Sequence, residues 1–218
     1  MLPKEAEWLG RTIRALDARE LSPMLNIGSS TGEFVTKHQP WIDAQVFRTL
    51  REKGVKVVNC DMKEAPGVDL VGDLADPSFL ERLSLQKFKS VLCANLLEHV
   101  ENRAQIARTL ASLVTSGGRL LVSGPHRYPY HPDPIDTMFR PTVDELADLF
   151  PETRVVSSDI VPCGTYWTYI ARTKMKLAKS LIRLALPLYA PRDWYTALRR
   201  LAWLNTEFEV VCVCLEKS

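Results

Sequence analysis

The feature that most constrains the fold of this chain is an alternation of short apolar runs with segments of helical spacing. Apolar runs occur at residues 24–27, 55–61, 67–73, 89–95 and 118–123. Helical segments are predicted at residues 4–19, 41–52, 77–83, 100–113 and 142–150. Strands that are apolar along their whole length are typical of a parallel sheet covered by helices on both faces. Because ligands of such sheets bind beyond the carboxyl ends of the strands, we expect the functional site at that edge.

The first apolar run leads into a turn that contains two glycines. Gly28 can take backbone angles that a β-carbon forbids, and Gly32 lets the following helical turn approach a ligand or a strand closely. Between them, Ser29, Ser30 and Thr31 offer backbone N–H groups and hydroxyls. Such a turn at the start of a helix favours a carboxylate or a phosphate. A tight connection without any ligand is the alternative interpretation.

Acidic residues close the next two strands. Asp61 is placed to accept hydrogen bonds from the two hydroxyls of a ribose, and Asp73 from an exocyclic amine of adenine. Each acid by itself also fits a helix cap or a solvated turn. A carboxylate at a strand end needs hydrogen-bond donors or water, and the two acids follow the glycine turn in order. Together they favour a nucleoside pocket.

Size and composition indicate one globular domain. The chain has 218 residues, and its 28 basic and 26 acidic residues argue neither for nor against a polyanionic partner. The five cysteines form no C-x-x-C pair, so we expect small buried side chains in a reducing compartment. The N-terminus carries acids where a signal peptide is apolar, and no apolar segment reaches about 18 residues. A cytoplasmic protein is the expectation.

Taken together, the ordered motifs resemble those of class I S-adenosylmethionine-dependent methyltransferases. The motifs are residues 24–32, Asp61, Gly72-Asp73-Leu74, the string Asn95-Leu-Leu-Glu-His-Val100, and residues 117–123. The Leu-Glu-His-Val part is similar to the type 11 methyltransferase subgroup. The resemblance implies an α/β, Rossmann-like mixed sheet of about seven strands, with helices on both faces and an antiparallel last strand beside the fifth. Residues 153–161 and 207–215 would form the closing pair of strands.

The resemblance also implies a single methyltransferase domain over residues 1–218. It comprises an N-terminal helix (1–20), a cofactor-binding core (21–161), a basic helical insert or lid (162–206) and a final strand (207–218).

S-adenosylmethionine is the cofactor that the resemblance implies. The residues expected to bind it are Asn26, Gly28, Ser29, Ser30, Gly32, Asp61, Met62, Asp73, Leu74, Asn95 and Leu96. The family usually has an acid where Asn26 stands and a glycine where Ser30 stands. Asn26 brings no charge to favour the cationic amino and sulfonium groups of the cofactor. A nicotinamide dehydrogenase is disfavoured because the G-x-G-x-x-G pattern is missing.

A proline-rich segment at residues 124–141 follows the fifth strand and is the expected acceptor site. Its five prolines stiffen it, and its polar side chains are unusual for a simple connector. The candidate bases are His126 and His131, with Asp133 or Asp136 as the orienting acid. The candidate anchors for an acidic substrate are Arg127 and Arg140. Hydrogen bonding within the loop is the alternative for each of them.

His99 is a fourth catalytic candidate. It follows the fourth strand, where it can also cap or pack against the helix that comes next. His131, Asp133 and Asp136 could together hold a metal ion, but their spacing is not diagnostic and no metal is predicted.

Residues 165–204 contain eight basic residues and one acidic residue. Arg172, Lys176, Lys179 and Arg183 have the spacing of one helical face. A lid packed on the domain is one interpretation, and contact of residues 172–200 with an anionic membrane surface is the other. Nucleic acid is disfavoured because no RNA-binding motif is present.

The sequence therefore predicts methyl transfer to an O or N atom of a small-molecule, sugar or lipid-linked acceptor. A protein that binds the cofactor without catalysis, or a membrane-peripheral partner, is the alternative.

Overall fold

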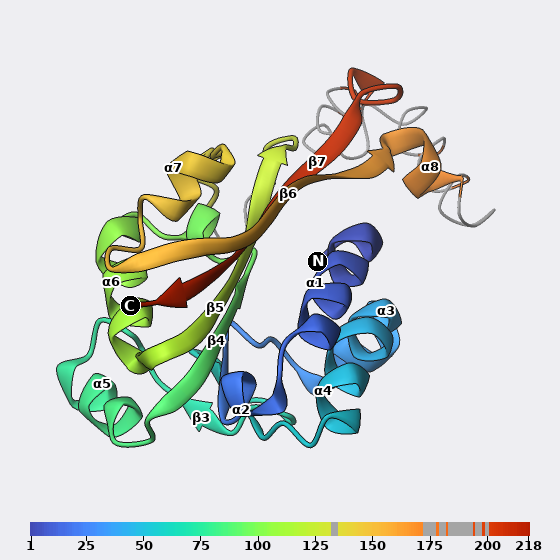
Figure 1. Ribbon diagram of the computed structural model, residues 1–218. Coiled ribbons are helices and arrows are strands. Elements are labelled where there is room, and N and C mark those ends of the chain that lie inside the picture. The colour runs from blue at the N-terminus through green and yellow to red at the C-terminus, as the bar shows by residue number, and fades with distance from the viewer. Residues whose placement is uncertain (132–134, 172–177, 179–181, 183–193, 195–197, 199–200) are drawn as a thin grey trace.

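A single seven-stranded sheet forms the centre of the computed structural model, which describes residues 1–131, 135–171, 178, 182, 194, 198 and 201–218 (Figure 1). The strands are β1 (Met24–Ile27), β2 (Val57–Asp61), β3 (Leu70–Val71), β4 (Phe88–Ala94), β5 (Val114–Arg127), β6 (Thr153–Thr165) and β7 (Glu207–Lys217). Their order is β3-β2-β1-β4-β5-β7-β6. β1 pairs in parallel with both β2 and β4, whereas β7 lies antiparallel between β5 and β6. The predicted mixed sheet and the antiparallel last strand beside the fifth are confirmed.

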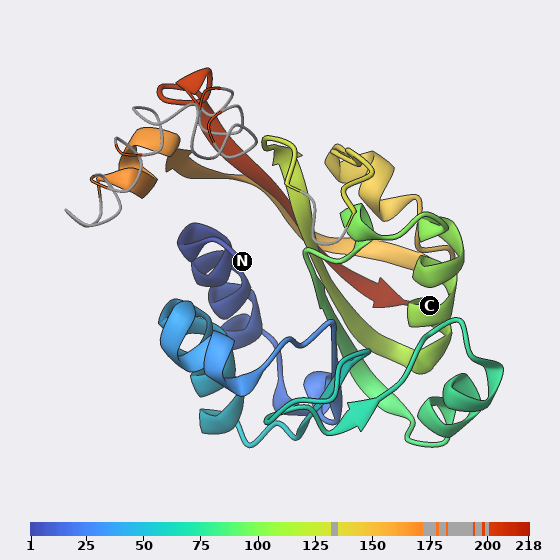
Figure 2. The ribbon, with the colours of Figure 1, turned by 180° about the vertical axis from the view of Figure 1, so that it is seen from behind.

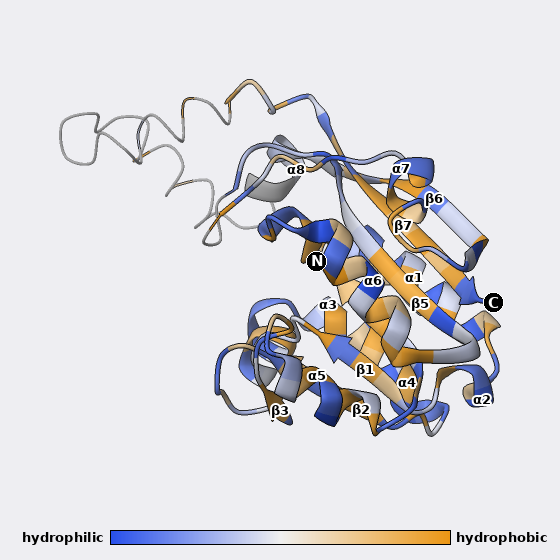
Figure 3. Ribbon diagram, turned by 90° about the vertical axis from the view of Figure 1, so that its left-hand side faces the viewer, coloured by the Kyte–Doolittle hydropathy of each residue, from blue (hydrophilic) through white to orange (hydrophobic). Residues whose placement is uncertain are grey.

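Helices cover the sheet on both faces (Figures 1 and 2). One face carries α1 (Pro3–Ala15), α2 (Ala18–Leu21), α3 (Pro40–Ile42), η2 (Asp43–Phe47) and α4 (Arg48–Glu52), with η1 (Phe34–His38) leading into them. The other face carries α5 (Pro77–Ser84), α6 (Arg103–Leu113) and α7 (Val143–Ala147). Neighbouring strand residues alternate between the faces: Met24 packs into the first cluster and Leu25 into the second. β5 and β7 accordingly carry long apolar stretches, whereas β6 at the edge of the sheet is mostly exposed (Figure 3).

Some predicted boundaries differ from the observed ones for local reasons. The helix expected at residues 4–19 ends at Ala15, because Asp17 caps a second helix with Glu20 in a capping box. The strand expected at 67–73 is reduced to Leu70–Val71, since the Asp69 carboxylate accepts the backbone N–H of Asn59 where pairing would begin. β5 extends to Arg127, which pairs with Glu209 of β7. The proline-rich loop is therefore shorter than predicted.

The segment between the last two strands begins with α8 (Tyr166–Ile170). The basic stripe predicted at Arg172, Lys176, Lys179 and Arg183 lies outside the described residues, and so does Asp133. Within the described part of the chain, no helix is both long and apolar enough to cross a bilayer. All five cysteines are buried, as the sequence predicts.

The contact of α1 with η2 requires a glycine at position 10. A β-carbon there would lie 2.4 Å from the backbone oxygen of Gln45, a distance that real β-carbons do not adopt. We expect Gly10→Ala to lower the free energy of unfolding by about 2 kcal/mol, because the helix must move away from its neighbour. Urea denaturation measures this loss. The exposed neighbour Arg11→Ala is the control, with an expected change within about 0.5 kcal/mol. Equal stability of both variants would contradict the close packing.

Candidate functional site

A cavity of about 680 Å³ opens at the carboxyl ends of β1 and β4. Its wall is built from the start of α1, the turn after β1, the end of β4, the loop after β5 and the segment around α8. Residues from these elements include Leu2, Glu5, Gly28, Ser30, Asn95, His99, Tyr128, His131, Tyr166 and Trp203. The cavity lies at the edge where the sequence predicts a ligand.

The turn after β1 presents Gly28 and Ser30 to this cavity. Gly28 has φ +65°, and a β-carbon there would lie 3.3 Å from Cδ1 of Leu96, so Leu96 packs directly over the turn. Ser30 also has a positive φ of 57°, a conformation that costs a non-glycine residue roughly 1 kcal/mol. Its backbone N–H donates to Oδ2 of Asp61 at 2.8 Å, which offsets this cost. A serine can therefore hold the position where the family that the motifs resemble usually has glycine.

Ser29 and Gly32 shape the turn instead of lining the cavity. Ser29 is buried, and its N–H donates to the Cys60 carbonyl. The Gly32 N–H donates to the Pro66 carbonyl at 2.9 Å, and a β-carbon at Gly32 would lie 3.3 Å from that oxygen. The close approach that Gly32 permits is thus to the chain's own loop after β2.

The residues predicted for the nucleoside do not line the cavity. Asp61 is tied to the turn through Ser30, and its Oδ1 accepts the N–H of Lys63 at 3.0 Å. Met62 is 69% exposed next to it. Asp73 is exposed and accepts the N–H of Ala75 at 2.8 Å, which is a local turn contact. Leu74 packs partly on the core. The structure joins Asp61 to the turn but does not bring Asp73 and Leu74 to the cavity.

Glu5 of α1 supplies a buried carboxylate at the cavity wall. Its Oε1 accepts hydrogen bonds of 2.7 Å from the Asn95 amide and from the Ser123 hydroxyl. Its Oε2 accepts the backbone N–H of Leu2 at 2.7 Å. All three donors are neutral, so they stabilise the carboxylate without cancelling its charge.

Sequence reasoning missed Glu5, although the absence of an acid at position 26 was a signal that another carboxylate is needed. Asn26 itself is buried and donates its amide to Oδ1 of Asn59 at 2.9 Å.

The structure separates the two histidines predicted as bases. His126 lies within β5, where its Nδ1 is 2.8 Å from the Pro141 carbonyl and its Nε2 is 4.0 Å from a Glu209 oxygen. It does not line the cavity, whereas His131 does. The predicted orienting acid, Asp136, lies with one oxygen 3.1 Å from Nδ1 of His131.

Asp136 is held in its charged form. Its side chain is fully buried, and this burial by itself raises the pKa. Hydrogen bonds from Arg140 and from the N–H groups of His131 and Met138 outweigh burial and keep the pKa of Asp136 well below its usual range. Arg140, predicted as a substrate anchor, is thus engaged inside the loop.

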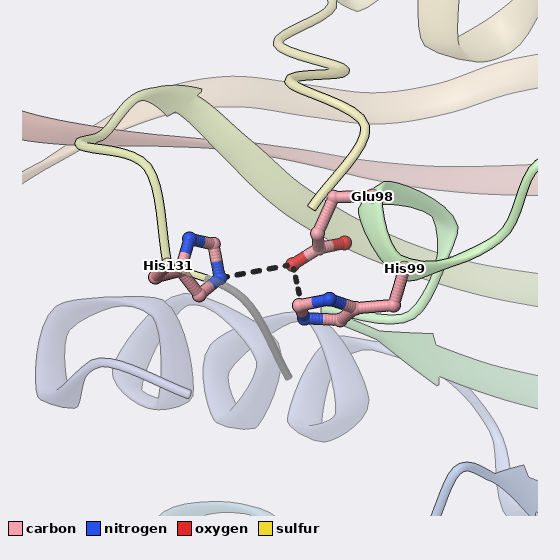
Figure 4. Close-up of side chains that lie close together, drawn as sticks. All are labelled: Glu98, His99 and His131. Atoms are coloured by element: carbon pink, nitrogen blue, oxygen red, sulfur yellow. Dashed lines mark ion pairs between the residues drawn. The ribbon is translucent and has the colours of Figure 1, made fainter. Parts of the chain in front are cut away.

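A second buried carboxylate, Glu98, faces both His99 and His131 (Figure 4). Its Oε1 lies 3.8 Å from Nε2 of His99 and 4.0 Å from Nε2 of His131. Burial raises the pKa of Glu98 to about 7 and lowers the pKa of His131. Sequence reasoning selected His99 but passed over the acid beside it in the same string.

Comparisons with known proteins agree with the observed topology. No protein-family model matches the sequence, and no curated protein sequence matches it significantly. Among solved structures, the chain is similar to the [4+2]-cyclase SpnF, with a TM-score of 0.59 and 12% identity over 97% of this chain and 81% of that one. It is also similar to the MccD protein, with a TM-score of 0.58 and 11% identity over 98% and 96% of the two chains.

A third similar structure is coclaurine N-methyltransferase bound to N-methylheliamine and S-adenosylhomocysteine. Its TM-score is 0.55, with 13% identity over 95% of this chain and 70% of that one. The fold is therefore the class I methyltransferase fold, as the sequence motifs imply. At these identities the likeness concerns the fold alone.

Proposed function

We propose that this protein transfers a methyl group from S-adenosylmethionine to an O or N atom of a small-molecule, sugar or lipid-linked acceptor. The observation that carries the proposal is the cavity of about 680 Å³ at the carboxyl ends of β1 and β4, lined by the Gly28 turn and by Asn95. Sheets of this kind bind their ligands at that edge. The similarity to methyltransferase structures supports the proposal through the fold.

The residues present fit the cofactor. Gly28 presents its backbone to the cavity, and Leu96 packs where a side chain of residue 28 would lie. Glu5 contributes the negative charge that a cationic amino or sulfonium group requires and that Asn26 does not provide. Asp61, held against the same turn by Ser30, is the acceptor for a ribose. Bound there, S-adenosylmethionine supplies a methyl group on a positively charged sulfur that is open to attack by a nucleophilic atom.

The aromatic residues that line the cavity are suited to position an acceptor. Tyr128, Tyr166, Trp203 and Phe208 offer flat apolar surface that excludes water. His99 and His131 stand at the same cavity with their Nε2 atoms toward Glu98. These nitrogens can take a proton or bind a cation next to the acceptor's polar atom.

Calorimetric titration of the purified chain with S-adenosylmethionine and S-adenosylhomocysteine tests the cofactor assignment. We expect one site per chain for each ligand. Asp61→Ala should weaken both about 10-fold, because a carboxylate that accepts ribose hydroxyls contributes roughly 1.5 kcal/mol or more. Glu64→Ala, an exposed neighbour on the same loop, is the matched control and should bind as the wild type does.

Two outcomes would contradict the proposal in different ways. Failure of the wild-type chain to bind either ligand would remove the cofactor assignment. Binding without methyl transfer to any acceptor in a panel of hydroxyl and amine compounds would favour the non-catalytic alternative. In that case the departures at Asn26 and Ser30 would mark a binding protein.

A further inference from the structure

Two imidazoles and one carboxylate converge at the edge of the cavity. Glu98 and His99 lie in η3 (Leu97–His99) directly after β4, and His131 lies in the loop after β5. One ligand atom from each of the three residues lies within 4.8 Å of the others. Because β4 and β5 are adjacent parallel strands, their carboxyl ends bring these two segments together.

The hydrogen bonds of both histidines direct Nε2 toward Glu98. The Nδ1 atom of His99 contacts the Ile135 carbonyl, and a carbonyl can only accept, so Nδ1 carries the proton. The Nδ1 atom of His131 lies 3.2 Å from the Pro129 carbonyl and 3.1 Å from the Asp136 carboxylate, which assigns the proton in the same way. Each Nε2 therefore has a free lone pair for a cation. This is the arrangement that oxygen acceptors impose on metal-binding histidines.

Hydrogen bonds from neighbouring loop residues fix the two segments that carry Glu98, His99 and His131. Asp136 receives two hydrogen bonds from the Arg140 guanidinium and one from the His131 N–H. The Thr137 N–H and hydroxyl both donate to the Glu98 carbonyl, which fixes η3 against the loop. The cluster is thus positioned by contacts outside itself.

The burial of the Glu98 carboxylate is not explained by contacts within the described part of the protein. Glu98 is 1% exposed, and within the described residues neither of its carboxylate oxygens has a hydrogen-bond partner. The distances of 3.8 and 4.0 Å to the two histidine nitrogens are too long for hydrogen bonds. A buried carboxylate without partners costs several kcal/mol unless a proton or a cation neutralises it.

We propose that Glu98, His99 and His131 bind a divalent transition metal ion of the zinc, cobalt or iron class. Three protein ligands of the His₂Glu type leave further coordination positions open, as in catalytic zinc sites. Ligand atoms of a tetrahedral zinc ion lie about 3.4 Å apart. The distances of 3.8 and 4.0 Å from Glu98 to the two histidines therefore have to shorten by about 0.4 and 0.6 Å. Magnesium fits less well, because it prefers oxygen ligands and two of the three here are imidazoles.

The metal site also bears on the methyl acceptor, an inference that rests on the proposed function. His99 and His131 line the same cavity as Gly28 and Asn95, so an open coordination position faces the place of the acceptor. A metal ion there binds and orients a hydroxyl oxygen and lowers its pKa. The acceptor class that this site favours is therefore a hydroxyl compound.

Titration of the chelator-stripped full chain with Co(II), followed by its visible absorption, tests the site, and competition with Zn(II) gives the zinc affinity. We expect one ion per chain and a rise of the melting temperature on addition of metal. His99→Ala and His131→Ala should each weaken binding by at least about 100-fold, since even outer contacts of metal ligands contribute 10- to 100-fold. His126→Ala, which changes a histidine of β5 outside the cluster, should bind metal as the wild type does.

Circular dichroism of the metal-free variants guards against loss of folding, and Glu98→Gln provides a nearly isosteric third variant. The proposal is overturned if the wild type binds neither Co(II) nor Zn(II), or if folded His99→Ala and His131→Ala variants bind as tightly as it does. Calorimetry with S-adenosylmethionine on the metal-free chain separates the two proposals. Cofactor binding without metal binding refutes only the metal site, and metal binding without cofactor binding refutes only the methyltransferase assignment.

Discussion

Asp136→Asn is expected to lower the melting temperature of this protein by about 10 °C. The substitution keeps the shape of the side chain but removes a charge that is fully buried against Arg140. Breaking a buried ion pair from one side costs roughly 3–5 kcal/mol, because the remaining charge stays buried without a partner. A domain of this size loses roughly 2–4 °C per kcal/mol. Differential scanning calorimetry measures the change.

Asp43→Asn is the matched control. Asp43 also receives two hydrogen bonds from one arginine, Arg51, but on the surface, where the arginine side chain is 58% exposed. Water compensates the loss there, so we expect less than about 1 kcal/mol. If the two variants melt at the same temperature, Asp136 does not hold the loop after β5 in the way the structure indicates. The proposed positioning of His131 by Asp136 would then also be wrong.

Glu5→Gln is expected to weaken S-adenosylmethionine binding about 100-fold. The substitution removes the negative charge and keeps an oxygen that can accept from Asn95 and Ser123. Two opposite unit charges about 6 Å apart in a partly buried setting attract by roughly 3 kcal/mol, which is close to 100-fold in affinity. Calorimetric titration gives the affinity, and the melting temperature shows how much stability the contact with the Leu2 N–H contributes.

Two further variants sharpen this test. Glu7→Gln changes the same residue type two positions along α1, where the side chain is 44% exposed and pairs with Lys4, and it should not affect the affinity. Asn26→Asp, introduced together with Glu5→Gln, should restore part of the lost binding. The new carboxylate can accept from the Asn59 amide once that amide rotates. Wild-type affinity in Glu5→Gln would show that the counter-charge of the cofactor lies elsewhere.

The sequence predicted correctly those cavity residues that follow closely after a strand of the sheet. Gly28 and Asn95 follow directly after β1 and β4, and in a parallel sheet the carboxyl ends of adjacent strands share one edge. Their place at the cavity therefore follows from the pattern of strands alone. His131 reached the cavity for a similar reason, because it follows β5.

Other predicted residues do not line the cavity, because the loops after the strands form hydrogen bonds of their own. Gly32 is covered by the loop at Pro66, and Asp73 binds the nearby N–H of Ala75. These are competing local hydrogen bonds, and residue type does not tell them from contacts to a ligand. The cofactor roles of these residues remain predictions.

The sequence by itself determined a parallel sheet covered by helices, because its apolar runs alternate with helical segments. The antiparallel last strand was implied by the resemblance of its motifs to class I methyltransferases. Only the tertiary structure decided which charged groups meet at the site. Glu5 contacts Asn95 and Ser123, which lie 90 and 118 residues away, and Glu98 meets His131 from a different strand end. Burial makes these two carboxylates strong interaction partners, because water no longer solvates them. The sequence does not distinguish a buried acid from a solvated one.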